Sequence, residues 1–146
     1  MKIFLVVLAL VGAVLAEEWV PKKLNDIKEI RSECLVSNPL SADQLTAMRN
    51  LVYPDEEAVR EYLLCVCKKW EIFCEHEGWH VDRIVKQFKL SLDEAEATRI
   101  AEGCADKNEQ KSSAAAWVYR GHKCLMASKI GDEIKEFMKK QLAKKA

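Results

Sequence analysis

The stretch Ser113-Ala-Ala-Ala-Trp-Val-Tyr-Arg-Gly-His-Lys-Cys-Leu-Met-Ala127 carries the strongest fold signal in this sequence. Ser113, or Ser112 just before it, is suited to cap a helix, and a helix over the residues that follow would be apolar around most of its circumference. A helix of that kind belongs at the centre of a bundle rather than on its surface. The stretch therefore predicts a helical protein built around residues 114–127.

The rest of the chain has the same helical periodicity, with apolar residues at spacings of three and four, and no run alternates cleanly enough for a strand. Two capping boxes, Ser41-Ala-Asp-Gln44 and Ser91-Leu-Asp-Glu94, and a break at Gly78 separate the segments. Short helices of this kind need tertiary packing and bridges to be stable. We predict an all-α fold, a single disulfide-stapled bundle of six to seven short helices around an apolar cavity. The expected helices beside the central one cover 24–35, 41–48, 54–70, 81–88, 91–103 and 130–142.

The beginning of the chain differs from the rest. Lys2 precedes an almost wholly apolar run from Ile3 to Leu15, and the small residues Val14 and Ala16 suit a cleavage site after Ala16. We expect residues 1–16 to be a secretory signal peptide and residues 17–146 to form one helical domain whose cysteines can oxidise. The alternative is a retained membrane anchor, for which the run is too short.

Charge and local patterns exclude several function classes. With 23 Lys and Arg residues against 23 Asp and Glu residues, the chain has no excess of basic residues to neutralise the phosphates of a nucleic acid. It has no nucleophile elbow and no His-Glu-x-x-His pattern, so we do not expect an enzyme. Cys65, Cys67, Cys74, His76 and His80 lie close together in sequence, but their spacing is irregular for zinc. We therefore expect no metal and no cofactor.

The cysteines form the most specific pattern of the sequence. With the helical periodicity, their intervals resemble those of the insect odorant-binding protein family, of the pheromone-binding and general odorant-binding type. That family has six cysteines, and its second and fifth would fall at Glu61 and Ala115. Loss of both members of one bridge is typical of its Minus-C subclass. Four short segments add to the resemblance: Tyr53-Pro-Asp-Glu-Glu57, Glu77-Gly78, Cys104-Ala-Asp-Lys-Asn108 and Arg120-Gly-His-Lys-Cys124.

The resemblance implies the bridges Cys34–Cys65 and Cys104–Cys124, whereas Cys67 and Cys74 have no counterpart in the family. On a helix Cys65 and Cys67 point about 200° apart, so they cannot exchange roles. A continuous helix would separate Cys67 from Cys74 by about 10 Å along its axis, which is beyond disulfide reach. Cys67 and Cys74 are therefore either free thiols or a third bridge across a helix end.

The resemblance also implies a secreted soluble carrier, which binds odorants, pheromones or lipid-like molecules in an internal apolar cavity. Such a cavity stays dry and accepts apolar guests. Tyr119, Arg120 and His122 are candidates for a polar handle, that is, for polar side chains that bind an alcohol or acid head group. The alternative is that they lie on the solvent-exposed side of a helix. The expected wall residues, each with plain core packing as the alternative, are Leu63, Trp70, Val81, Ile84, Val85, Phe88, Trp117, Val118, Gly121, Leu125 and Phe137.

Partner and location follow from the same resemblance. We expect a monomer or weak dimer in an extracellular fluid such as sensillar lymph or haemolymph. We expect its partner to be a small hydrophobic molecule, and the resemblance is also compatible with a second partner, a chemosensory receptor. We expect no stable membrane insertion. His76 and His80, beside acidic residues, predict weaker ligand retention near about pH 5 than near about pH 7.5.

A second hypothesis is a membrane-active or partner-binding domain that acts through the last helix. Interfacial helices combine an apolar stripe with a basic polar face. The basic residues near this stripe are Lys129, Lys135, Lys139, Lys140, Lys144 and Lys145.

Overall fold

The computed structural model describes residues 17–144, which form seven α-helices and one short two-stranded ladder. The all-α prediction of six to seven short helices is thereby confirmed. The predicted signal peptide, residues 1–16, lies outside the described residues. The helices are α1 (Leu24–Ser37), α2 (Ala42–Arg49), α3 (Glu57–Lys69), α4 (Val81–Phe88), α5 (Glu94–Cys104), α6 (Ala114–Met126) and α7 (Lys129–Ala143).

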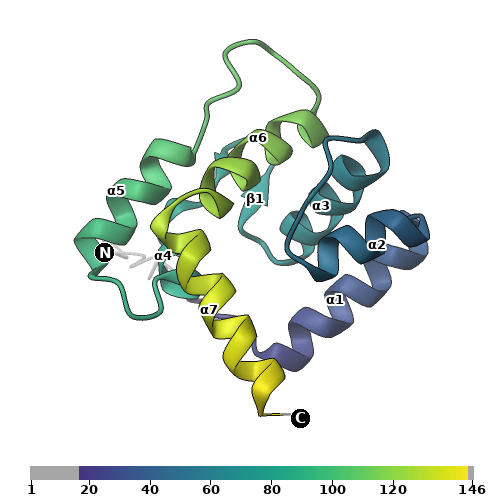
Figure 1. Cartoon of the computed structure of the whole chain (residues 1–146). Coiled ribbons are helices and arrows are strands. Elements are labelled where there is room, and N and C mark those ends of the chain that lie inside the picture. Colours follow the sequence, from purple (N-terminus) through teal and green to yellow (C-terminus); the bar gives the residue numbers. More distant parts are fainter. Residues whose placement is uncertain (1–16, 145–146) are drawn as a thin grey trace, which may run out of the picture.

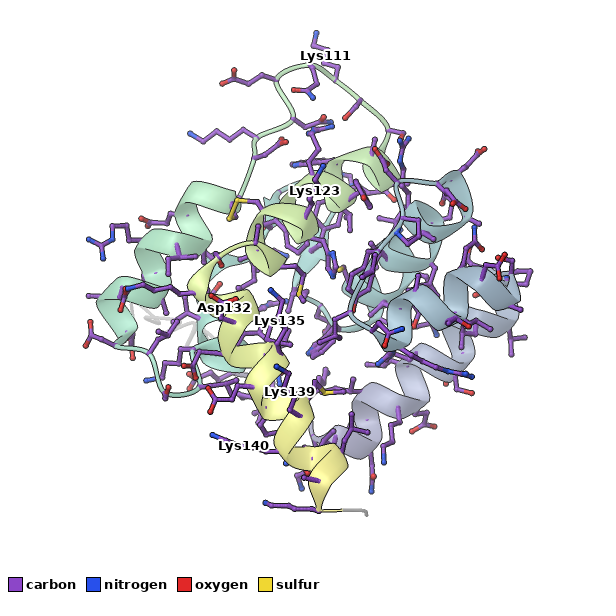
Figure 2. The ribbon with its side chains drawn as sticks, viewed as in Figure 1. Lys111, Lys123, Asp132, Lys135, Lys139 and Lys140 are labelled. Carbon is purple, nitrogen blue, oxygen red and sulfur yellow. A yellow bond between two sulfur atoms is a disulfide. The ribbon has the colours of Figure 1, made fainter. Side chains whose placement is uncertain are left out.

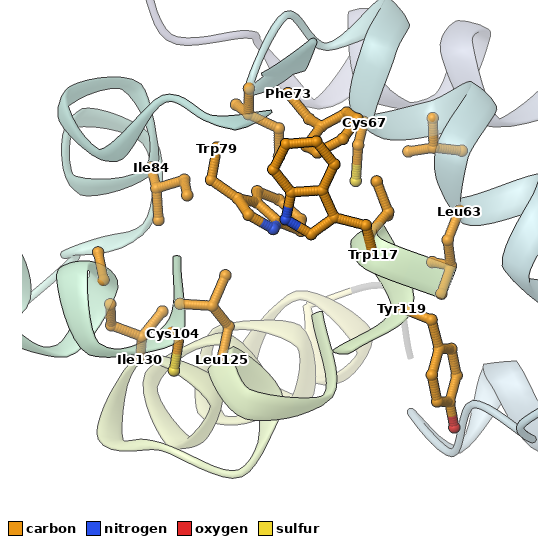
Figure 3. Packing of buried hydrophobic residues seen from close by; sticks show 14 of the residues in the cluster. Leu63, Cys67, Phe73, Trp79, Ile84, Cys104, Trp117, Tyr119, Leu125 and Ile130 are labelled. Atoms are coloured by element: carbon orange, nitrogen blue, oxygen red, sulfur yellow. The ribbon is translucent and has the colours of Figure 1, made fainter. Parts of the chain in front are cut away.

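Helix α6 has the central position that its apolar sequence predicts. It packs against α3, α5 and α7, and Figure 1 shows α5 and α3 on either side of it. Its residues Val118 and Trp117 are buried, with exposed fractions of 0% and 9%. The aromatic rings of Phe73, Trp79 and Trp117 pack together in the core shown in Figure 3. The centroid of the Phe73 ring lies 5.4 Å from that of Trp79 and 5.0 Å from that of Trp117.

The helix starts agree only in part with the capping signals. Ser41 caps α2 as expected, because its Oγ accepts a hydrogen bond from the Gln44 N–H at 3.2 Å and the Gln44 side chain accepts one from the Ser41 N–H at 2.9 Å. The predicted cap at Ser91 is wrong, since Asp93 accepts from the first-turn amides of α5. The Ser91 hydroxyl instead donates to Glu133 of α7 at 2.6 Å. A capping box cannot tell which of two nearby polar residues ends the preceding loop.

The expectation of no strand is also wrong. β1 (Phe73–Cys74) and β2 (Gly78–Trp79) pair antiparallel, with Phe73 opposite Trp79 and Cys74 opposite Gly78. Two-residue strands are too short to show an alternating pattern, so the break at Gly78 was the one sign of this hairpin in the sequence. Gly78 has φ of +80°, and a Cβ there would lie 2.5 Å from Cζ2 of Trp117. The hairpin therefore needs glycine both for its backbone and for its approach to α6.

Two disulfides staple the helices. Cys34 of α1 pairs with Cys65 of α3, and Cys104 of α5 pairs with Cys124 of α6, at Cα–Cα distances of 5.8 and 5.4 Å. These are the two bridges that the family resemblance implies. In the chain-entropy account, closing loops of this length stabilises the fold by roughly 3 to 4 kcal/mol each.

The remaining two cysteines, Cys67 and Cys74, are free thiols in the structure and do not form a third bridge. Cys67 is buried, and burial raises its pKa to about 12. Cys74 is half-buried in the β1–β2 hairpin. A thiol with a raised pKa is nearly all protonated and behaves as a small apolar side chain.

Candidate functional site

A pocket of about 450 Å³ lies between α1, α3, α4, α6 and α7. Its size falls within the range of about 300 to 1,000 Å³ that is usual for small-molecule sites. Five of the eleven wall residues expected from the sequence line it: Leu63, Trp70, Phe88, Leu125 and Phe137. The pocket therefore combines side chains from distant parts of the chain, and most of them are apolar.

The other six expected wall residues do not line this pocket: Val81, Ile84, Val85, Trp117, Val118 and Gly121. Ile84 and Val118, with exposed fractions of 1% and 0%, pack in the filled part of the core. Helical periodicity identifies the buried face of a helix, but it does not tell whether that face meets other side chains or empty space.

Gly121 has a packing role rather than the ligand-clearance role that the sequence also allowed. A Cβ at this position would lie 2.6 Å from Cε2 and 2.8 Å from Cζ2 of the Trp79 indole. The missing side chain thus lets Trp79 lie directly against α6. Figure 3 shows the Trp79 ring beside that of Trp117 in the same core.

Sequence reasoning missed the side of the pocket formed by α1, by the α2–α3 loop and by polar tyrosines. A helix with mixed polar and apolar residues gave no sign that its polar side chains border a cavity. Tyr53 of the loop and Tyr62 of α3 both line it. The lining residues that were not expected include Lys22, Ile27, Lys28, Arg31, Met48, Leu51, Tyr53, Tyr62, Val66, Ile134 and Met138.

Two of the three expected polar handles make other contacts. Arg120 is bound to the α5–α6 loop, because its guanidinium pairs with Asp106, through Nη2 to Oδ1 at 3.2 Å, and donates to Ser112 Oγ at 2.8 Å. This pairing holds the pKa of Asp106 below its ordinary value. The Tyr119 hydroxyl donates to the backbone oxygen of Tyr53 at 2.8 Å. Neither Arg120 nor Tyr119 lines the pocket.

His122 is the handle that does line the pocket. Its Nδ1 is buried without a hydrogen-bond partner among the described residues, and its ring meets the edge of Tyr53 at a centroid distance of 4.3 Å. Burial lowers the pKa of His122 to about 4. His76 and His80, to which the sequence assigned a pH response, are not among the lining residues.

The polar end of the pocket centres on Arg31 of α1. Its Nε donates to the hydroxyl of Tyr62 at 3.2 Å. Elsewhere in the lining, Gln87 of α4 accepts from the Trp70 indole N–H at 3.1 Å and from the backbone N–H of Lys22 at 2.8 Å. These bonds tie the segment before α1 to the pocket wall, so the wall is fixed by hydrogen bonds as well as by packing.

Helix α7 turns its apolar stripe toward the pocket. Ile130, Ile134, Phe137 and Met138 all line it, and Ile130 is fully buried. Figure 2 shows Lys135, Lys139 and Lys140 along the same helix. Within residues 17–144, no helix is long and apolar enough to cross a membrane.

A separate cluster occurs in the β1–β2 hairpin. Ligand atoms of Cys74, Glu77 and His80 lie within 4.8 Å of one another, and the Glu77 N–H donates to Cys74 Sγ at 3.3 Å. The Glu77 side chain is 75% exposed. Structural zinc takes four protein ligands, and this cluster offers three. The hairpin therefore gives no metal assignment.

Comparison with known proteins confirms the family resemblance. The PBP/GOBP family profile matches residues 16–128. General odorant-binding protein 99a of Drosophila melanogaster is 32% identical over 149 residues, covering 100% of each chain. Odorant-binding protein 22 of Aedes aegypti is 32% identical over 130 residues, 89% of this chain and 93% of the relative. The assignment agrees with the expectation that the chain is not an enzyme, while the Minus-C subclass stays a prediction. The extent of these matches shows that the chain belongs to the PBP/GOBP family.

Proposed function

We propose that the protein is a secreted carrier that binds one small hydrophobic molecule in the pocket between α1, α3, α4, α6 and α7 and transports it through an aqueous extracellular fluid. The observation that carries this proposal is the pocket of about 450 Å³ with its largely apolar lining. Membership in the PBP/GOBP family supports it, since both relatives of 32% identity are named as odorant-binding proteins.

The energetics of apolar burial suffice for useful binding. About ten buried methylene groups at ~0.8 kcal/mol each give ~8 kcal/mol, which is the scale of a micromolar dissociation constant before the costs of binding. A chain of about ten to sixteen carbons, or a terpenoid of similar area, needs no strong polar contact to reach this range. Leu63, Phe88, Leu125 and Phe137 are the wall residues we assign to such a ligand.

The rival function, a membrane-active domain acting through α7, has less support. An interfacial helix needs its apolar face exposed to the bilayer surface. In α7 that face lines the pocket, and Leu142 is the large apolar side chain of the helix that is mainly exposed, at 64%. The lysines alone give an electrostatic attraction that salt weakens.

The test is a titration of the purified protein with N-phenyl-1-naphthylamine, a fluorescent probe that brightens in apolar surroundings, with and without anionic phospholipid vesicles. We expect saturable enhancement at one probe per protein without vesicles, and no sedimentation of the protein with vesicles at about 0.15 M salt. Cosedimentation of the protein together with an absence of saturable probe binding would favour the membrane-active function and overturn the carrier.

A further inference from the structure

The charged residues of the pocket lining are all of one sign. Lys22, Lys28 and Arg31 line the pocket, whereas no Asp or Glu of residues 17–144 does. All three come from α1 and the segment just before it, so the positive charge lies on one side of the apolar space. Lys22 is paired with Glu71 at 2.9 Å, which leaves Lys28 and Arg31 without a carboxylate partner among the described residues.

Arg31 is the cation best placed to meet a ligand. Its side chain is half-buried, and Tyr62, to which it donates, is 2% exposed. A guanidinium carries five N–H donors and stays charged in proteins, and here the described residues account for one of the five. A partly buried charge without a counter-ion loses hydration without electrostatic compensation. A negatively charged head group in the pocket would give Arg31 a counter-ion, which it lacks among the described residues.

Two phenols complete the polar end. The Tyr62 hydroxyl accepts from Arg31 and keeps its own proton for donation. Tyr53 also lines the pocket and lies close enough to Arg31 and Tyr62 for their charges to act on it, and burial raises its pKa. Each phenol thus offers a hydroxyl that can donate a hydrogen bond, beside a planar cation whose geometry matches a carboxylate.

We propose that the pocket selects an amphiphile with a carboxylate head group, held by the guanidinium of Arg31 and the hydroxyl of Tyr62, with its hydrocarbon tail against Leu63, Phe88 and Phe137. This inference rests on the proposed carrier function and specifies its ligand class. Lys22 is paired with Glu71 and Lys28 is exposed to solvent, so the half-buried Arg31 is the cation that matches a singly charged head group. The apolar remainder of the lining matches one alkyl chain of about ten to sixteen carbons.

The experiment compares two ligands of the same chain length, dodecanoate and dodecan-1-ol, as competitors of N-phenyl-1-naphthylamine at about pH 7.5. It uses the wild-type protein, Arg31→Met, Tyr62→Phe and Arg99→Met. Methionine keeps an unbranched apolar side chain at position 31 but removes the charge. Arg99 is exposed on α5 and does not line the pocket, so it is the matched control.

We expect Arg31→Met to reduce the ratio of dodecanoate affinity to dodecan-1-ol affinity by about tenfold or more, because a charge-assisted bidentate contact is lost. Tyr62→Phe should reduce the ratio less, and Arg99→Met should leave it unchanged. Equal weakening of both ligands in Arg31→Met, or an unchanged ratio, would overturn the carboxylate proposal while leaving the carrier intact. If the wild-type protein binds the probe but neither ligand displaces it, this inference fails and the carrier stands, whereas an absence of saturable probe binding would overturn the carrier itself.

Discussion

Replacing His122 with Gln should reduce the loss of stability that the protein suffers between about pH 7 and pH 4 by about 3 kcal/mol. Burial lowers the pKa of His122 from 6.5 to about 4. In the unfolded chain the imidazole is protonated below about pH 6.5, whereas in the folded protein it stays neutral until about pH 4. Between these values the unfolded state binds more protons, so acidification favours unfolding.

The magnitude follows from the size of the shift. One pKa unit corresponds to about 1.4 kcal/mol, so lowering the pKa from 6.5 to about 4 gives a loss of about 3 kcal/mol that is complete below about pH 4. The smaller pocket beside His122 is lined, among the described residues, by Lys123 and Lys135 and by no carboxylate. A net stability of only about 5 to 15 kcal/mol makes this loss easy to measure.

The assay is urea unfolding, followed by tryptophan fluorescence, at several pH values from about 4 to 7.5 for the wild-type protein, His122→Gln and His76→Gln. Carboxylates such as Asp106, whose pKa is lowered beside Arg120, also contribute to the pH dependence, so the difference between curves is the informative quantity. We expect the wild type and the exposed-site control His76→Gln to lose about 3 kcal/mol more than His122→Gln. Parallel curves for all three proteins would refute the reasoning.

Three further predictions concern packing, the proposed lost bridge and thiol chemistry. Gly121→Ala should lower the free energy of unfolding by about 1 to 2 kcal/mol, because the energetic cost of the steric overlap with Trp79 exceeds the gain in helix propensity. Equal or higher stability in urea unfolding would contradict this. Glu61→Cys combined with Ala115→Cys should form a disulfide and raise the melting temperature, whereas two thiols remaining reduced on non-reducing peptide mapping would count against the Minus-C alignment. Cys67 should react with iodoacetamide far more slowly in the native protein than in urea, because burial raises its pKa to about 12. Mass spectrometry of digests measures the two rates, and equal rates would mean that the thiol is accessible.

The fold was largely predictable because its signals are local and mutually consistent. The apolar circumference of residues 114–127 indicated a central helix, and α6 packs against three other helices. The capping box at Ser41 was predictive because its two hydrogen bonds join residues three apart. The ladder of Phe73–Cys74 with Gly78–Trp79 was not predictable, since two-residue strands leave no periodicity.

The site was less predictable because a pocket depends on where side chains fail to meet. Periodicity places Ile84 and Leu125 alike on buried faces, yet one packs in the core and the other lines the pocket. Arg120 looked available for a ligand, but Asp106 binds it through a loop whose shape the sequence does not reveal. Arg31 went unnoticed because its significance depends on the absence of an acidic neighbour within the lining, a property of the tertiary structure.

The most direct test of the central claim is the affinity of N-phenyl-1-naphthylamine for Val66→Phe, measured beside Val36→Phe. Val66 is 7% exposed and lines the pocket, whereas Val36 on α1 is 84% exposed, so the same added ring enters the pocket in one variant and solvent in the other. Circular dichroism and urea unfolding establish that both variants are folded, since overpacking costs about 1 to 3 kcal/mol. We predict that a folded Val66→Phe binds the probe at least about tenfold more weakly than the wild type and that Val36→Phe binds it equally well. Wild-type affinity and stoichiometry in a folded Val66→Phe would contradict the claim that this pocket is where the protein holds its ligand.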